Sequence, residues 1–421
     1  MFAIFFLIFL VIGMPVGFAL GISAFYYFLF EGGIPAEGFM NTLFSGINEF
    51  TLMAIPFFVL AGSLMNEGRL TERLVFLSRA LVGHIQGGLA HVNVVTSMFF
   101  AGISGSAVAD TSAVGSILIP AMEEDGYDRD LATAITAASS CIGPIIPPSI
   151  PMVVYAVTAG VSIGGMFLAG VIPGVILGLG QMGLVAYYAK KRGYGATNKF
   201  SFKVLWQAIK EGIWAIGMIV IILGGIFGGL FTATEAAVVA VVYSMLVGFF
   251  ATKELKITRI PQIFRDAALT TSVVMMVISM AAVFGRVLTM EKIPPAMAEA
   301  FMSISDNKIV LLLLLNLFLL FVGTWLELGA AVVILVPVLL PLAGQLGLDP
   351  LHFGAIVVIN LIIGFITPPL GVCLFVGCAV GNVAFEELVR VIWPFIIIGI
   401  ILILLITFIP ALTTWLPSIV L

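Results

Sequence analysis

The chain has 421 residues, of which 61% are hydrophobic and only 10% are charged, and its mean hydropathy is +1.23. Soluble domains are about 45–50% apolar and about 25% charged, so this composition excludes an ordinary soluble protein. The formal net charge of −4 is spread over loops and argues against nucleic acid as a partner. The three cysteines, Cys141, Cys373 and Cys378, lie in apolar segments, which argues against a disulfide framework.

Several uncharged runs are long enough to cross a bilayer, which takes about 20 residues of helix. Such sustained hydrophobicity predicts a helical bundle rather than a barrel, whose short strands would alternate polar and apolar residues. The first run, Met1–Phe30, lacks the basic region of a cleavable signal peptide, so we expect a retained first helix there. The runs are Met1–Phe30, Leu131–Ala189 (two passes), Gly212–Thr234, Pro350–Phe385 and Val391–Leu421.

Lysine and arginine gather in three loops, which the positive-inside rule places in the cytoplasm. The second loop, 190–212, carries Trp206, Ile209 and Trp214 at near-helical spacing. This spacing fits either an amphipathic arm along the membrane interface or a plain solvated connector. The basic residues of the three loops are Arg69, Arg73 and Arg79; Lys190, Lys191, Arg192, Lys199, Lys203 and Lys210; and Lys253, Lys256, Arg259 and Arg265.

These loops set the expected direction of each pass. We expect Met1–Phe30 to run outward and Phe50–Leu64 to return. His91–Met122 has Gly-Ile-Ser-Gly-Ser at its centre and acidic residues after its end, which predicts a hairpin that enters and leaves on one side. A second hairpin, at 309–342, is expected to enter from outside. The remaining passes are expected at 131–161, 164–188, 212–230, 235–251, 267–285, 350–380 and 392–416.

Two patterns recur in the second half of the chain and predict an internal repeat. Ile-Leu-Ile-Pro at 117–120 returns as Ile-Leu-Val-Pro at 334–337, and Gly-Pro-Ile-Ile-Pro-Pro at 143–148 returns as Gly-Phe-Ile-Thr-Pro-Pro at 364–369. Asp110 and Glu327 have the same separation as the first pair, 217 positions, so each half places one carboxylate at the same point of its hairpin.

The predicted fold class is an all-α polytopic membrane protein, built as an inverted repeat with two re-entrant helical hairpins and two discontinuous helices. Four full passes per unit would leave the units parallel, and the unmatched helix 212–230 inverts the second. Such repeats are typical of secondary transporters, whose sites lie near the bilayer midplane. The expected regions are a first repeat at 1–189 (hairpin 88–122, broken helix 131–161), an interfacial arm and linking helix at 190–230, and a second repeat at 231–421 (hairpin 306–342, broken helix 350–380).

The double prolines at 147–148 and 368–369 predict breaks in two membrane helices, because proline lacks an N–H and clashes with the preceding turn. Freed backbone groups cost several kcal/mol each in lipid, so such breaks are expected at a site. The carbonyls of Gly143–Ile146 and Gly364–Thr367 suit Na⁺, and the new helix N-termini suit a substrate carboxylate. The alternative is a proline kink that only adapts helix packing.

The expected hairpin tips, Gly102–Ser106 and Gly323–Thr324, are small and hydroxylic. Such residues supply oxygen ligands and allow close backbone approach, or they only permit tight helix packing. Asp110 and Glu327 lie in apolar segments, where a carboxylate costs about 2.5–3.5 kcal/mol, so each either contacts a ligand or caps a helix. No nucleotide-binding or nucleophile motif occurs, which predicts a protein that is not an enzyme and that uses an ion gradient or another subunit for energy.

Four runs resemble the large membrane subunit of the tripartite ATP-independent periplasmic (TRAP) transporters, the DctM-like family, and the resemblance covers essentially the whole chain. It implies an elevator-type symporter of the bacterial or archaeal inner membrane, in which Na⁺ drives uptake of an organic acid such as sialic acid or a C4-dicarboxylate. It also implies two partners, a periplasmic substrate-binding protein and a small four-helix membrane subunit. The runs are Ser-Gly-Ser-Ala-Val-Ala-Asp-Thr-Ser-Ala-Val-Gly (104–115), Ile-Pro-Pro-Ser (146–149), Thr-Ala-Thr-Glu-Ala-Ala (232–237) and Gly-Phe-Ile-Thr-Pro-Pro-Leu-Gly (364–371).

The resemblance also implies site residues. The first Na⁺ site would use Ser104, Ser106, Gly143, Ile146 and Pro148, and the second would use Gly323, Gly364 and Thr367. The substrate would lie near Asp110, Thr111, Ser112 and Glu327. Two other functions stay open at this point: a stand-alone divalent-anion/Na⁺ symporter of the same architecture, and a channel or passive scaffold for a partner.

Overall fold

The structure is a computed structural model that describes residues 1–32, 35–196 and 200–421, and every regular element in these ranges is a helix. Within them, eight stretches are long and apolar enough to cross a membrane. They are Phe50–Glu67, Ile163–Arg192, Phe202–Phe227, Ala233–Ala251, Ile257–Met290, Lys308–Trp325, Leu328–Gln345 and Phe385–Phe408.

The first half of the chain contains a helical hairpin followed by a broken helix. Hairpin 1 is α6 (Gly88–Ser104) and α7 (Ala107–Glu124), and the broken helix is α8 (Arg129–Ser140) and α9 (Ile150–Ala159), separated by the first break at 141–149. The hairpin reverses at Gly105, whose φ of 58° lies in the left-handed region that glycine adopts readily. Ser106 caps α7, because its Oγ accepts a hydrogen bond from Ala109 N at 3.4 Å.

The second half repeats this arrangement. Hairpin 2 is α15 (Lys308–Trp325) and α16 (Leu328–Gln345), and the broken helix is α17 (Pro350–Gly364) and α18 (Val372–Gly381), separated by the second break at 365–371. The Pro147–Pro148 and Pro368–Pro369 peptide bonds are both cis. The predicted pair of hairpins and pair of discontinuous helices is therefore confirmed.

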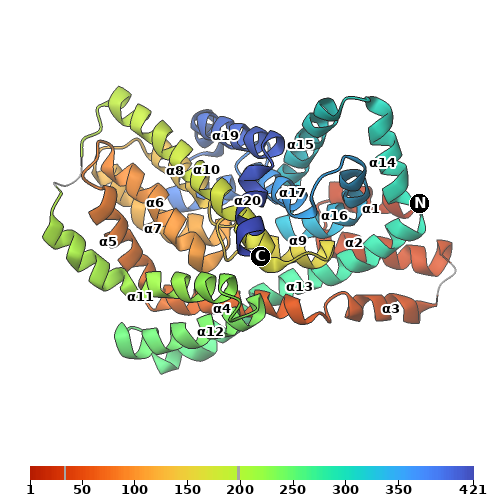
Figure 1. The fold of residues 1–421 in the computed structure, drawn as a ribbon, viewed down its shortest axis with the longest axis horizontal. Coiled ribbons are helices and arrows are strands. Elements are labelled where there is room, and N and C mark those ends of the chain that lie inside the picture. The colour runs from red at the N-terminus through yellow and green to blue at the C-terminus, as the bar shows by residue number, and fades with distance from the viewer. Residues whose placement is uncertain (33–34, 197–199) are drawn as a thin grey trace.

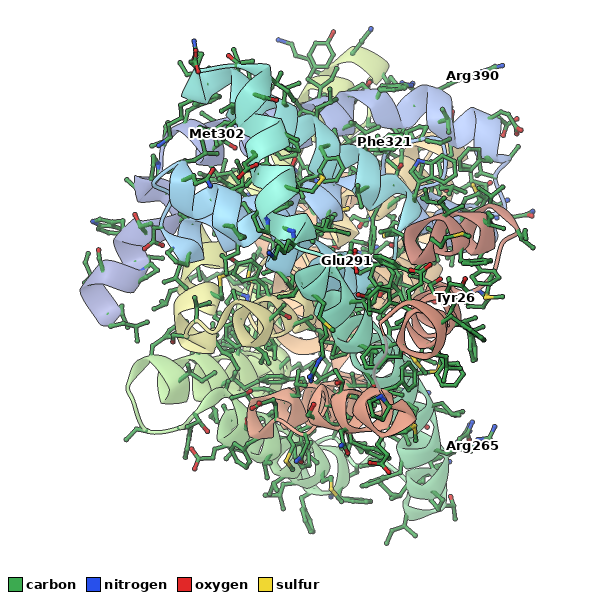
Figure 2. The ribbon with its side chains drawn as sticks, turned by 90° about the vertical axis from the view of Figure 1, so that its right-hand side faces the viewer. Tyr26, Arg265, Glu291, Met302, Phe321 and Arg390 are labelled. Carbon is green, nitrogen blue, oxygen red and sulfur yellow. The ribbon has the colours of Figure 1, made fainter. Side chains whose placement is uncertain are left out.

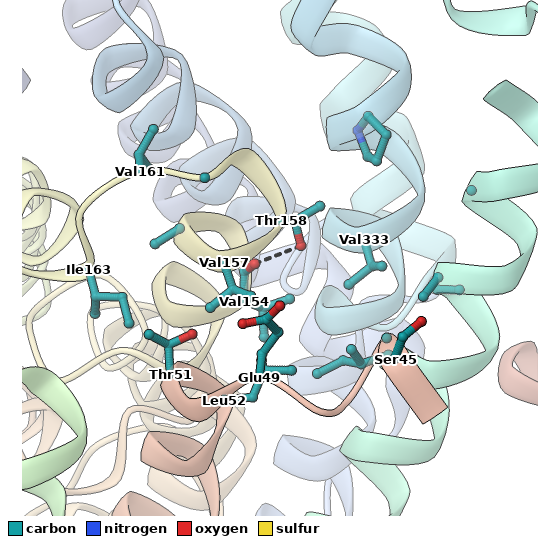
Figure 3. A pocket seen from close by; sticks show the side chains of 18 of the residues that line it. Ser45, Glu49, Thr51, Leu52, Val154, Val157, Thr158, Val161, Ile163 and Val333 are labelled. Carbon is teal, nitrogen blue, oxygen red and sulfur yellow. Dashed lines mark hydrogen bonds between the residues drawn. The ribbon is translucent and has the colours of Figure 1, made fainter. Parts of the chain in front are cut away.

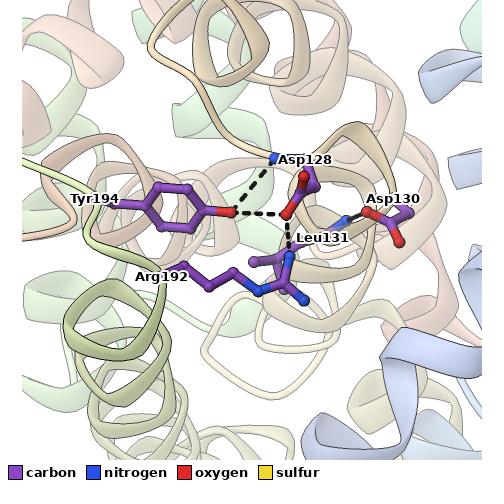
Figure 4. Close-up of polar contacts among 5 residues, drawn as sticks. All are labelled: Asp128, Asp130, Leu131, Arg192 and Tyr194. Carbon is purple, nitrogen blue, oxygen red and sulfur yellow. Dashed lines mark hydrogen bonds and ion pairs between the residues drawn. The ribbon is translucent and has the colours of Figure 1, made fainter.

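The two hairpins enter the molecule from opposite ends of α10 (Ile163–Arg192). At one end, Arg192 forms an ion pair with Asp128 at the base of hairpin 1 (Figure 4). At the other end, Gly165 packs against Leu351, next to the base of hairpin 2. Figure 1 shows hairpin 1 on the left and hairpin 2 on the right. The 30 residues of α10 form a helix about 45 Å long, which spans the full thickness of a membrane. The bases of the two hairpins therefore lie on opposite sides of the membrane, and the two halves are inverted relative to each other.

The two halves interlock at the centre. The helix after each break packs against the hairpin of the other half: α18 against α7, and α9 against α16. Together with α10, α19 (Phe385–Phe408) and α20 (Ala411–Val420), these elements form the hairpin bundle. Each hairpin therefore packs against the broken helices of both halves, and the two halves share one core.

An outer layer of helices packs against the hairpin bundle, at the left, bottom and right of Figure 1. Its long helix α13 contacts α2, α4 and α16, and so joins the outer layer to hairpin 2. The outer helices are α1 (Phe2–Val11), α2 (Val16–Tyr26), η1 (Tyr27–Glu31), α3 (Ala36–Ser45), η2 (Phe50–Met53), α4 (Ala54–Glu67), α5 (Leu70–Val82), α11 (Phe202–Phe227), α12 (Ala233–Leu246), η3 (Val247–Ala251), η4 (Ile257–Arg259), α13 (Ile260–Met290) and α14 (Ile293–Ile304).

The prediction of a single outward helix at Met1–Phe30 was wrong. Gly13, with φ of 83°, and Pro15 divide this run into α1 and a second helix, α2 with η1, and helices of 10 to 16 residues reach only about 15 to 24 Å. The N-terminal amine lies 3.3 Å from Glu31 Oε1, so both ends of the run lie on one side.

The start of the chain lies on the side opposite the basic loops. Tyr27 donates a hydrogen bond to Glu291, just after the end of α13, whereas Arg259 at its start pairs with Glu67. Figure 2 shows Glu291 and Arg265 far apart along this helix. The run therefore forms a short antiparallel hairpin there, and the expected outward pass does not occur.

The stretch predicted as an arm or connector is helical from Phe202 onward, where it forms the first turns of the long helix α11. Phe202 and Trp206 are exposed, and the Lys210 ammonium lies 5.6 Å from the centre of the Trp206 ring. Lys199 lies outside the described residues. The exposed aromatic and basic side chains favour the interfacial arm over the solvated connector for residues 202–211.

A buried amide hydrogen bond joins hairpin and broken helix in each half. In the first half, Asn93 Nδ2 donates to Thr136 Oγ1 at 2.6 Å. In the second, Asn360 Nδ2 donates to Asn316 Oδ1 at 3.0 Å, and Asn316 Nδ2 donates to Thr407 Oγ1 at 3.0 Å. Buried amides need such partners, so these bonds fix how each hairpin sits on its broken helix.

Asn316→Ala is expected to lower the thermal midpoint of the purified protein. The substitution removes two buried hydrogen bonds, at a cost of about 1 kcal/mol each, although the Asn360 amide keeps Ile356 O and the Thr407 hydroxyl keeps Ile403 O as partners. Asn41→Ala, at an exposed position on α3, is the control and should leave the midpoint unchanged. Equal midpoints for the two variants would show that this bond does not hold hairpin 2 in place.

Candidate functional site

Each hairpin tip touches the break of its own half at backbone distance. A Cβ atom placed on Gly105 would lie 2.5 Å from the carbonyl oxygen of Pro148 in the first break. A Cβ atom on Gly323 would lie 2.7 Å from the carbonyl oxygen of Leu361, one turn before the second break, and Gly364 packs directly on Gly323. Only glycine permits this approach, so the two tips and two breaks form two compact clusters of backbone groups.

The first turns of four helices line one central cavity of about 340 Å³. All four helices begin at a hairpin tip or at a break, so their N-termini point toward the same space. Each N-terminus leaves backbone N–H groups without intrahelical partners and carries a partial positive charge. The residues concerned are Ala107, Val108 and Ala109 of α7, Ile150 and Pro151 of α9, Leu328 and Gly329 of α16, and Val372 of α18.

The outer layer closes the cavity on its other side. Gly62, Ser63 and Asn66 contribute from the C-terminal part of α4, and Thr270 and Val274 from the N-terminal half of α13. These are the parts of both helices nearest to the basic loops. The cavity therefore lies between the hairpin bundle and the outer layer, in the half of their interface that the positive-inside rule places toward the cytoplasm.

The predicted ion-site residues lie at the tips and breaks. Ser104 and Ser106 line the cavity, and the Ser106 backbone N–H donates to Ser104 Oγ at 3.4 Å. Gly143 packs against the carbonyl of Ser106, which brings the first tip and first break together. Thr367 is half-buried in the second break, and its hydroxyl donates to Ile363 O at 2.8 Å.

Ile146 and Glu327, two further predicted site residues, also contact other parts of the structure. The side chain of Ile146 packs toward Gly174 on α10, away from the first tip. Glu327 lines the cavity and is the N-cap of α16, since its Oε2 accepts from Ala330 N at 3.0 Å. Among the described residues that line the cavity, Glu327 alone has a formal charge. The capping interpretation of Glu327 is therefore confirmed, and its contact with a substrate stays a prediction.

Asp110, Thr111 and Ser112 lie elsewhere, contrary to the expectation that they approach the substrate. Asp110 is fully buried between α6, α7 and α8: Ser97 donates to its Oδ1 at 3.3 Å, and its Oδ2 has no partner. The Thr111 hydroxyl donates back to Ala107 O, and Ser112 is exposed outside the cavity. The reason is helical phase, because the first turn of α7 turns positions 107–109 toward the cavity and position 110 away from it.

The sequence model of the family described as tripartite ATP-independent periplasmic transporter, DctM component, matches residues 3–412. The chain belongs to this family. It is therefore a multi-pass inner-membrane protein, in agreement with its eight membrane-length stretches within the described residues.

Relatives of this DctM-family chain are transporter permeases. It is 42% identical over 408 residues to the isethionate TRAP transporter permease protein DctMQ of Oleidesulfovibrio alaskensis, covering 97% of this chain and 64% of that protein. It is 41% identical over 406 residues to the sialic acid TRAP transporter large permease protein SiaM of Vibrio cholerae, covering 96% and 95%. The YdaH transporter of Alcanivorax borkumensis has the same fold, with a TM-score of 0.61 at 15% identity, covering 91% of this chain and 89% of that one.

Sequence reasoning missed the cavity wall that the outer layer of the DctM-family fold provides. Ser63 and Asn66 lie three positions apart on α4 and so share one helix face, with Gly62 beside them. Thr270 begins a Thr-Thr-Ser run in α13. Polar residues at helical spacing inside apolar membrane helices were the available signal.

A second cavity of about 570 Å³ occupies the other half of the same interface (Figure 3). It lies between the turn that joins α3 to α4, helix α9, and the C-terminal half of α13. The carboxylate of Glu49 points into it, and the Thr158 hydroxyl on the α9 side donates to Val154 O at 2.8 Å. The hairpin bundle is thus loosely packed against the outer layer on both sides of the midplane.

Proposed function

We propose that the chain is the large transmembrane subunit of a Na⁺-coupled TRAP transporter that imports an organic acid. The observation that carries this proposal is the convergence of four helix N-termini on one cavity, next to two clusters of tip and break carbonyls. The N-termini attract the carboxylate or sulfonate of an organic anion, and the carbonyls and hydroxyls suit Na⁺.

The charge balance of the cavity supports coupling to Na⁺. No lysine or arginine is among the described residues that line it, and Glu327 adds a negative charge. An organic anion that enters this space needs more positive charge than helix dipoles supply, since each N-terminus is equivalent to only about half an elementary charge. Two Na⁺ ions, bound at the first and second tips, would supply it.

The two cavities in the interface support an elevator mechanism. The hairpin bundle would slide along the outer layer and carry the central cavity from one side of the membrane to the other. The arrangement described here, with the central cavity beside the basic loops, corresponds to the inward-facing state. The cavity beside Glu49 marks the half of the interface that the site would occupy in the outward-facing state.

The substrate class and the partners follow from the relatives. The names of two of them specify isethionate and sialic acid, both organic anions that fit the polarity of the cavity. As a DctM component, the chain would work with a periplasmic substrate-binding protein and a small membrane subunit. The binding protein would do most of the substrate selection.

The test is uptake into proteoliposomes that contain this chain and its small subunit, with a candidate binding protein outside. We expect uptake that requires an inward Na⁺ gradient and stops when either partner is omitted. We also expect Na⁺, but not choline, to raise the thermal midpoint of the purified protein. Uptake by this chain alone would instead favour a stand-alone symporter, and an absence of any Na⁺ effect would contradict both ion sites.

A further inference from the structure

A third pocket, of about 340 Å³, lies between the end of α5 and the start of α11, outside the transport cavity. It lies beside the two connections between the outer layer and the hairpin bundle at this end of the molecule, the left edge of Figure 1. Gly87 N, at the base of hairpin 1, donates to Gly195 O at 2.9 Å and so holds these connections together. The described residues that line the pocket are Phe76, Arg79, Ala80, His84, Phe200, Ser201 and Val204.

Arg79 has no anionic partner in this pocket. It is the only formally charged residue in the described lining, and its Nε is buried without a hydrogen-bond partner. An unsatisfied buried guanidinium N–H costs more than an ordinary lost hydrogen bond, because the group is charged. An anion in the pocket would remove this cost.

A neighbouring pocket differs from that of Arg79, because its arginines lie beside acidic residues. On the other side of Phe76, Arg69 and Arg73 lie among three glutamates, Glu72, Glu211 and Glu254. Arg69 Nε lies 3.9 Å from Glu72 Oε1 and 3.8 Å from Glu254 Oε2. Arg69 is paired within the protein, and Arg73 shares a lining that contains three acidic residues, so of these two pockets the one of Arg79 is better suited to an external anion.

Polar groups besides Arg79 face the same space. Ser201 is the N-cap of α11, and within the described residues its hydroxyl makes no capping hydrogen bond to the first turn of the helix. His84 lines the pocket, and its ring meets the Phe200 ring edge-on with centres 5.1 Å apart. A guanidinium, a hydroxyl and an imidazole around one pocket are donors that a phosphate group accepts well.

The rim of the pocket is apolar and faces outward. Phe200, Phe202 and Val204 are 54%, 74% and 43% exposed, and Trp206 follows on the same helix. The positive-inside rule places this end of the molecule at the cytoplasmic interface, where acidic lipids and aromatic side chains gather. A soluble phosphate would gain nothing from this rim, whereas a lipid would cover it with its acyl chains.

We propose that this pocket binds a phosphate group through Arg79, Ser201 and His84, and that its source is the headgroup of an acidic phospholipid. The lipid would join the loop after α5 to the start of α11, and so stabilise both connections to the hairpin bundle. This proposal does not depend on the transported substrate or on Na⁺.

The test uses the purified full chain in nanodiscs of phosphatidylcholine, with or without phosphatidylglycerol, and compares Arg79→Gln with Arg73→Gln. The readouts are the number of phosphatidylglycerol molecules retained in native mass spectrometry and the thermal midpoint. We expect Arg79→Gln to bind phosphatidylglycerol roughly tenfold more weakly, since a charge-assisted hydrogen bond contributes on this scale. Arg73→Gln should bind it like the wild type.

A separate arm adds inorganic phosphate to phosphatidylcholine nanodiscs. If phosphate raises the thermal midpoint of the wild type but not that of Arg79→Gln, the pocket binds phosphate, and its ligand is a soluble anion. If Arg79→Gln folds poorly, Phe200→Glu replaces it, because an acid at this exposed position should repel the headgroup. Equal retention of phosphatidylglycerol by the wild type and the variant used, without a phosphate effect, overturns the proposal.

Discussion

Gly323→Ala is expected to reduce Na⁺-driven uptake by roughly ten- to a hundredfold, which corresponds to an overpacking cost of about 1–3 kcal/mol. The added methyl group would lie 2.7 Å from Leu361 O and 2.8 Å from Leu361 Cα. Both are backbone atoms of α17, which cannot move aside as the end of a flexible side chain can. The tip of hairpin 2 must therefore retreat from the second break, and the carbonyls proposed to hold the second Na⁺ move apart.

Gly344→Ala is the matched control for this prediction. Gly344 lies in the same hairpin, near the end of α16, and outside its chain neighbours and its own helical backbone no atom of the described residues lies within 4 Å of its added methyl group. Alanine is also the better helix former, so this variant should be at least as stable as the wild type. Initial uptake rates and the Na⁺-induced rise of the thermal midpoint should separate the two variants. Equal values for both would remove the second ion site from the mechanism.

Glu327→Gln is expected to raise the Na⁺ concentration for half-maximal uptake by about tenfold. Glu327 carries the single formal charge among the described residues that line the cavity, and two Na⁺ ions bound nearby would be attracted to it. Opposite charges attract appreciably at a protein surface when they lie near each other, and water in the cavity screens part of this attraction. The substitution removes the charge and keeps the length of the side chain.

Glu327→Asp separates charge from capping. Aspartate keeps the negative charge and is itself a preferred N-cap, so α16 should begin as before. We expect its Na⁺ dependence to stay within about threefold of the wild type. A rise as large as that of Glu327→Gln would show that the position of the carboxylate on α16, rather than its charge, controls Na⁺ binding.

The hairpins and breaks were predictable because they depend on local chemistry. Glycine and proline determine backbone geometry within a few residues, so the reversal at Gly105 and the interruptions at 141–149 and 365–371 are visible in the sequence itself. The same rule explains an error. Met1–Phe30 was predicted as one helix on hydropathy alone, although Gly13 and Pro15 divide it.

The site was only partly predictable. The tip and break residues proposed for Na⁺ follow from backbone constraints, and the structure brings them together. The inner positions of α7 do not follow in this way, because α6, α8 and α18 all pack against this helix, and local chemistry does not determine which of them each side chain faces. The sequence therefore indicates a carboxylate of importance at Asp110 without indicating which way it points.

The sequence by itself thus determined a helical membrane protein with two hairpins and two broken helices, since composition, glycine and proline act locally. Only the tertiary structure decided that four helix N-termini share one cavity, that Glu327 faces it, and that Asp110 is buried behind it. It also decided that α4 and α13 complete the wall. These features depend on contacts between segments as far apart in the sequence as Val59 and Val372, and on the rotation of each helix about its axis, which hydropathy and motifs do not specify.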